Sequence, residues 1–150
     1  MIYKIVNGFI LGLALTLMVD FLVFIGLKLH YFDALKITEY FNIYFFDHQS
    51  FVLLGISALF FGIGVLYTPF AKLFWWGYLV LLGVSSLALM ESVGRSLGEA
   101  FFLQENQQFQ VGNVRFVGDL LYEGRHAIYV KRPDVEHTIR IVKSDVRWGL

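Results

Sequence analysis

Asp20 is the residue whose chemistry stands out, because it is an ionisable side chain inside an apolar stretch long enough to cross a membrane. A carboxylate near the bilayer centre costs about 2.5–3.5 kcal/mol on insertion scales, so it needs a compensating partner. Gly8, Gly12, Thr16 and Asp20 are spaced by four residues, which places them on one face of a helix. Small residues on such a face let a second helix approach closely. We therefore expect a helix-packing or ion site on this face.

Three interpretations of Asp20 are open on the sequence. Seven residues separate it from the end of the apolar stretch, so its carboxylate can lie near the membrane surface, in water or paired with Lys28. It can instead contact a basic residue of a partner subunit. The third interpretation is a proton or cation site on a path across the membrane.

A second set of charged residues follows Met90. Glu91, Arg95 and Glu99 are spaced by four, so one helix would carry them as a charged stripe with mutual i,i+4 pairing. We expect the preceding apolar helix to run on through this stripe as it leaves the membrane.

Histidines and cysteines give little support for a metal site. His30 and His48 flank a loop that contains acidic residues, but their spacing matches no zinc motif. A pairing of His126 with His137 across a hairpin is one interpretation, and exposed polar strand residues are the one we expect. The chain contains no cysteine, which excludes disulfides and thiolate chemistry. We predict no metal and no cofactor.

The second half of the chain carries a candidate basic rim. Its members are Lys131, Arg132, Arg140, Lys143 and Arg147. Residues 93–150 hold 8 basic and 7 acidic residues, so a solvated sheet face is the expectation and contact with anionic lipid headgroups is the alternative. Phosphate-binding glycine loops, nucleophile elbows and paired catalytic carboxylates are absent from the sequence, so we do not expect an enzyme.

Composition indicates where the chain resides. Its 150 residues are 57% hydrophobic and 16% charged, whereas about a quarter of the residues of a soluble domain are charged. Residues 1–92 hold 9 of the 24 charged side chains, and residues 93–150 hold the other 15. The net charge is zero, which argues against nucleic acid as a partner. The sequence predicts a membrane part followed by a water-exposed part.

Three apolar runs are predicted to span the bilayer, for which about 20 residues suffice. They cover residues 5–27, between Lys4 and Lys28, then residues 51–67 and residues 73–90. A cleaved signal peptide is the competing interpretation of the first run, but no small-residue cleavage motif closes it. Pro69 suits the first turn of the third helix. The tight link that contains Lys72 is typical of a cytoplasmic turn, and we expect a cytoplasmic N-terminus.

The segment 31–48 lies between the first two spans and is too short and polar to cross. Aromatic and aliphatic residues from Ile37 to Phe45 recur at helical spacing opposite Lys36 and Glu39. This pattern is typical of an amphipathic helix lying on the bilayer surface. A loop whose aromatic residues belong to an interfacial belt explains it equally well.

A small antiparallel sheet is predicted in the second half. From Phe109 the apolar residues alternate with polar ones, for example Ile128 and Val130 around Tyr129. Glu123-Gly124 and Arg132-Pro133-Asp134 supply turns. We expect three or four strands. A module of this size has too few residues to form a stable fold by itself.

Together these patterns predict an α-helical integral membrane protein in which three transmembrane helices precede a small antiparallel β module. The membrane domain covers residues 1–92, and residues 93–150 form a helix extension and the β module. The expected function is a non-catalytic accessory or assembly subunit of a larger membrane complex, docked through the Gly8 to Asp20 face. The alternative is a homo-oligomeric channel or ion-coupled component that uses Asp20. Its expected partners are lipid, other membrane subunits or copies of itself, in a bacterial inner membrane.

Overall fold

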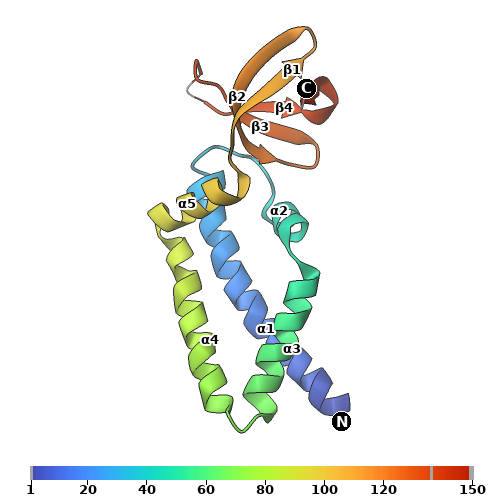
Figure 1. Ribbon diagram of the computed structural model, residues 1–150, viewed down its shortest axis with the longest axis vertical. Helices are drawn as coiled ribbons and strands as arrows, with labels where there is room; N and C mark the ends of the chain where they lie inside the picture. Colours follow the sequence, from blue (N-terminus) through green and yellow to red (C-terminus); the bar gives the residue numbers. More distant parts are fainter. Residues whose placement is uncertain (1, 136, 149–150) are drawn as a thin grey trace.

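The computed structural model describes residues 2–135 and 137–148, with the helices first and a β-sheet after them. The helices are α1 (Ile2–Leu27), α2 (Phe41–His48), α3 (Phe51–Tyr67), α4 (Ala71–Ser86) and α5 (Glu91–Phe102). A π-helical turn, Lys28–Phe32, continues α1, and a 3₁₀ turn, Leu87–Leu89, follows α4. In Figure 1, α1, α3 and α4 run along the long axis, α5 crosses the end of α1, and the sheet stands beyond it.

Two helices of the described chain are long and apolar enough to cross a membrane. One is the continuous helix Ile2–Phe32 and the other is Ala71–Leu89. A third candidate combines α2 with α3, but these two helices are bent by 81° at the break between them. The predicted boundaries 51–67 match α3, whose N-cap Ser50 accepts a hydrogen bond from the Leu53 amide.

The third apolar helix ends earlier than predicted. The helix does not continue into the charged stripe, because Met90 has extended backbone angles (φ −81°, ψ 137°) and α5 starts afresh at Glu91. The redirected helix α5 packs Gly94 against the carbonyl groups of Ala88 and Gly26, where a Cβ atom would overlap them. The stripe therefore lies on a short separate helix.

Segment 31–48 combines the two interpretations that the sequence left open, a surface helix and a loop. Only Phe41–His48 forms an α-helix there, and residues 33–40 form a turn and an extended stretch. Ile37, Tyr44 and Phe45, which would lie on the apolar face of the predicted surface helix, are buried inside the protein. These three side chains contact the rest of the chain, whereas Tyr40, which lies on the same face of the predicted helix, is 76% exposed.

The β part is one antiparallel sheet with strand order β4-β3-β2-β1-β5. The strands are β1 (Gln104–Val111), β2 (Val114–Glu123), β3 (Ala127–Lys131), β4 (Ile139–Val142) and β5 (Val146–Trp148). Gly112 and Asn113 form the tight turn between β1 and β2, and Gly112 has φ +57°, a backbone conformation that favours glycine. The Phe109 side chain belongs to an apolar cluster inside this sheet with Leu120, Ile128, Val130 and Val146.

A second buried cluster joins the sheet to the helices. It consists of Tyr31, Phe32, Ile37, Tyr44, Leu121, Tyr122 and Tyr129, which come from the end of α1, the following loop, α2, β2 and β3. We call this set the junction cluster. Buried aromatic side chains contribute large apolar areas and further ring-to-ring attraction, so the cluster holds the sheet in place on the helices.

Candidate functional site

The small-residue face of α1 does meet another helix, but that helix belongs to the same chain. A Cβ atom on Gly12 would overlap the carbonyl of Ala58 in α3, and a Cβ atom on Gly62 would overlap the carbonyl of Gly8. The α1 and α3 backbones are therefore in direct contact. Because α3 covers this face, the docking surface expected at Gly8 and Gly12 is not free for a separate subunit.

Asp20 has a partner that the sequence interpretations did not include. The Gln49 Nε2 atom donates a hydrogen bond to Asp20 Oδ2 at 3.0 Å, from the residue just before the N-cap of α3. Lys28, the expected local partner, pairs instead with Asp33. Thr16 Oγ1, one helical turn before Asp20, and Gln49 Oε1 are buried without a hydrogen-bond partner among the described residues.

The charged stripe lies in the open on α5. Arg95 Nε donates to Glu99 Oε1 at 3.0 Å, as the i,i+4 spacing predicts, and Glu91 is exposed without an ion pair in the part of the chain described. An exposed pair of this kind contributes about 0.3–0.5 kcal/mol. The geometry assigns this stripe no chemical role.

The histidines do not assemble a metal site within the described residues. His30 Nε2 lies 2.8 Å from the Leu89 carbonyl oxygen, and His48 Nδ1 lies 3.0 Å from that of Tyr44. His126 and His137 are both exposed and do not face each other. The register pairs Ala127 with Val142 and Val130 with Ile139, so these histidines lie at opposite ends of the β3–β4 hairpin.

Polar contacts supplement the junction cluster between sheet and helices. Tyr31 donates from its hydroxyl to the Leu121 carbonyl at 2.8 Å, and Thr138 Oγ1 donates to the Leu35 carbonyl at 2.5 Å. The Arg125 guanidinium after β2 binds both carboxylate oxygens of Asp47 in α2. That hydrogen-bonded ion pair lowers the pKa of Asp47 below its ordinary value. These contacts join residues 78 or more positions apart, so no local pattern in the sequence signals them.

Tyr122 differs from Tyr31 of the same junction cluster in the environment of its hydroxyl group. Its hydroxyl is buried and has no hydrogen-bond partner among the described residues. Burial raises the pKa of Tyr122, and the negative charges of Glu39 and Asp47 raise it further. A buried hydroxyl without a partner carries the full cost of its lost hydration.

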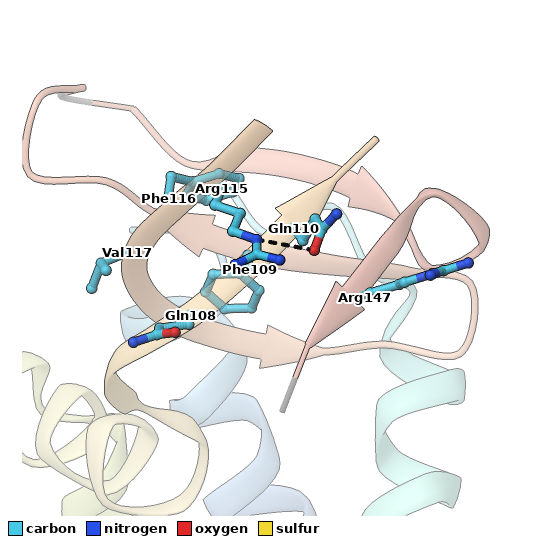
Figure 2. A pocket seen from close by; sticks show the side chains of 7 residues that line it. All are labelled: Gln108, Phe109, Gln110, Arg115, Phe116, Val117 and Arg147. Atoms are coloured by element: carbon cyan, nitrogen blue, oxygen red, sulfur yellow. Dashed lines mark hydrogen bonds between the residues drawn. The ribbon is translucent and has the colours of Figure 1, made fainter. Parts of the chain in front are cut away.

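A hollow lies on the exposed face of the sheet, at the end of β1 far from α5. Its volume is about 150 Å³, and its lining comes from β1, β2 and β5 (Figure 2): Gln108, Phe109, Gln110, Arg115, Phe116, Val117 and Arg147. Gln110 pairs in register with Arg115 on one side and with Arg147 on the other. The three side chains therefore form one row across three strands. We call this row with the hollow the cationic row.

Hydrogen bonds hold the middle of the cationic row. Arg115 Nε donates to Gln110 Oε1 at 3.3 Å, and Gln110 Nε2 donates to the Gly112 carbonyl at 3.1 Å. Figure 2 shows Arg115 reaching back to Gln110, while Arg147 extends away from the hollow on the neighbouring strand. Neither arginine forms an ion pair with another described residue, so both charges are available to a ligand.

Two members of the predicted basic rim are neutralised. Arg132 pairs with Asp134 at 2.5 Å, and Lys143 pairs with Glu123 at 2.6 Å. Arg147 was among the rim residues, but the sequence interpretation missed Arg115 and Gln110. Alternation along β1 and β2 places both on the outer face, yet only the strand register aligns them with Arg147.

A larger and mostly apolar hollow lies between α1, α2 and α5. Its volume is about 330 Å³, and Val23, Phe24, Leu27, His48, Phe101 and Phe102 line it. The His48 ring packs edge-on against Phe102, 5.1 Å between ring centres. Nothing in the described chain indicates which molecule would fill this hollow.

No family model matches this chain, and neither the curated proteins nor the solved structures compared with it include a similar one.

Proposed function

We propose that the chain is an integral membrane protein whose three helical spans hold the β-sheet at the surface of a bacterial inner membrane. In this role it is a non-catalytic accessory or assembly subunit of a larger membrane complex. The observation that carries the membrane part of the proposal is the length of the first helix. Its 31 residues extend about 46 Å, roughly 15 Å more than the hydrocarbon core of a bilayer. The excess length ends in the junction cluster beneath the sheet.

The outer surface of the helical part supports membrane insertion. Large apolar side chains that point outward occur along all three long helices, among them Ile10, Phe60 and Val80, each at least 60% exposed. A soluble monomer rarely exposes apolar patches larger than a few hundred Å². In lipid the same surface is favourable.

Charged and aromatic residues suit the two edges of the proposed membrane layer. At one edge, the Lys4 ammonium lies 5.5 Å from the centre of the Tyr67 ring, close to the link between α3 and α4. At the other edge, Lys28 pairs with Asp33 at the end of α1 that lies nearest the sheet. Interfacial tyrosines and lysines are typical anchors of membrane helices. We propose that the end with Lys4 and Lys72 is cytoplasmic.

The partner contact is better assigned to the sheet than to α1. The small-residue face of α1 is covered by α3, whereas the junction cluster fixes the sheet and leaves its outer face exposed. A module held in one orientation loses less entropy when it binds.

An ion path through Asp20 has less support. The Asp20 carboxylate accepts a hydrogen bond from Gln49 of the same chain, at the level where α3 begins. Its position beside that helix end suits a membrane edge better than the middle of a conduction path.

A pull-down in mild detergent tests the proposal. A tagged copy expressed at native level should recover other membrane proteins at fixed stoichiometry, as identified by mass spectrometry and by the native mass of the eluted species. Asp20→Asn keeps an acceptor for Gln49 and should leave this recovery unchanged. Recovery only as a symmetric multiple of itself, with ion flux lost in Asp20→Asn, would refute the subunit role and favour the channel.

A further inference from the structure

We propose that the cationic row binds carboxylate side chains of an acidic segment of a partner protein, one at Arg115 beside the hollow and one at Arg147. The inference rests on the proposed function, since it names the surface through which the subunit would contact its complex. The Cα atoms of Arg115 in β2 and Arg147 in β5 are about 10 Å apart, because strand β1 lies between these two strands. Each guanidinium can hold a carboxylate with two parallel hydrogen bonds.

The size of the hollow favours a side chain over a cofactor. Pockets for drug-sized ligands usually measure about 300–1,000 Å³, whereas this hollow measures about 150 Å³. An aspartate or glutamate side chain fits that space. Val117, half exposed at the edge of the hollow, offers an apolar contact for the methylene groups of such a side chain.

The surrounding charges leave the two arginines unsatisfied. Among the described residues, no acidic side chain on the nearby strands and turns forms an ion pair with either arginine: Asp119 accepts a hydrogen bond from the Asn106 amide, and Asp145, which lines a neighbouring hollow with Arg147, accepts one from the Ser144 hydroxyl. Gln110 holds the Arg115 guanidinium in place without neutralising it. An external anion is therefore the complementary ligand.

The position of the row favours a protein over the membrane as the source of this anion. Strand β1 starts directly after α5 and carries the chain about 20 Å from Gln104 to Gln110, away from the helices (Figure 1). That distance is about twice the Debye length at 0.1 M salt, so lipid headgroups at the helix ends attract the row only weakly. A segment of a neighbouring protein can approach the row from the aqueous side.

Peptide binding to the full chain tests the inference. The protein in a detergent with neutral headgroups is titrated into a labelled short peptide of alternating glutamate and serine, and fluorescence anisotropy reports binding. The matched peptide has glutamine in place of glutamate. We expect only the glutamate peptide to bind, with an affinity that falls as salt is added. Arg115→Gln and Arg147→Gln should each weaken binding by about 1.4- to fivefold, the range for an exposed ion pair.

Arg140→Gln is the matched control, because it removes the same charge from the exposed surface of β4. It should leave the affinity unchanged. The inference is wrong if the glutamate peptide does not bind, if both peptides bind equally, or if Arg140→Gln weakens binding as much as Arg115→Gln. It is also wrong if protein in neutral nanodiscs captures phosphatidylglycerol vesicles through Arg115, since the row would then recognise lipid.

Failure of this inference is distinguishable from failure of the subunit role. If Arg115→Gln and Arg147→Gln proteins recover the complete complex and the peptide does not bind, the partner contacts another surface and the subunit role stands. If the wild-type chain recovers only copies of itself, the subunit role fails whatever the peptide does.

Discussion

Two buried tyrosines of the junction cluster should respond in opposite directions to loss of the hydroxyl group. The Tyr31 hydroxyl donates to the Leu121 carbonyl at 2.8 Å, whereas the Tyr122 hydroxyl is buried without a partner among the described residues. Tyr31→Phe therefore breaks a hydrogen bond and leaves a buried carbonyl with one contact fewer. Tyr122→Phe removes an unpaired polar group and keeps the ring.

The magnitudes follow from the cost of an unsatisfied buried polar group, about 1–3 kcal/mol. We expect Tyr31→Phe to lower the free energy of unfolding by about 1.5 kcal/mol and Tyr122→Phe to raise it by about 1 kcal/mol. For a chain of this length, Tyr31→Phe should lower the midpoint Tm by about 3–6 °C, and Tyr122→Phe should raise it by about 2–4 °C.

Thermal unfolding in detergent, followed by near-ultraviolet circular dichroism, measures both shifts. Tyr40→Phe is the matched control, because the Tyr40 side chain is 76% exposed and should leave Tm unchanged. A lower Tm in Tyr122→Phe would refute the reasoning, since its hydroxyl would then have a stabilising partner such as a buried water.

Two further variants test the helix contact and the ion pair of the junction. Gly12→Ala places a methyl group against the Ala58 carbonyl and should lower the free energy of unfolding by about 1–3 kcal/mol. The control Gly55→Ala adds a methyl group in open space and should be neutral or stabilising. Thermal unfolding compares the two variants, and equal shifts in Tm would contradict the close α1–α3 contact. Arg125 lowers the pKa of Asp47 in the folded protein. The ion pair between them therefore contributes fully to stability above the ordinary carboxyl pKa, and this contribution is lost as the pH falls through the lowered pKa of the folded state. Hydrogen exchange of the junction should therefore become faster in acid in the wild type, and Asp47→Asn should remove that part of the pH dependence; an identical acid response in both proteins would contradict this assignment.

The sequence predicts the helical elements best where local signals mark their ends. Residues 51–67 are matched because Ser50 caps the helix and a link with Pro69 follows it. The break at Met90 carries no such signal, because no proline or glycine lies between Ser85 and Val93 and Glu91, Arg95 and Glu99 keep helical spacing beyond it. The tertiary packing of Gly94 against Gly26 and Ala88 accompanies the change of direction, and that contact is invisible in a local pattern.

Strand prediction fails where neither face is buried. Residues 104–108 at the start of β1 are mostly exposed on both faces, so they have no apolar alternation to detect. The short strand β5 pairs with β1, the farthest strand from it in sequence, and it completes the cationic row through Arg147. The candidate site thus depends on strand order and register, which the periodicity of single strands does not encode.

The central claim is that three helical spans hold the sheet at a membrane surface. Labelling of single cysteines in sealed membrane vesicles tests this claim most directly. The chain contains no cysteine, so each introduced thiol reports one position. Thr68→Cys in the α3–α4 link and Asn113→Cys at the β1–β2 turn should react with a membrane-impermeant maleimide from opposite sides, and the protein should stay in the membrane after an alkaline wash. Reaction of both positions from the same side, or release of the protein by the wash, would contradict the account.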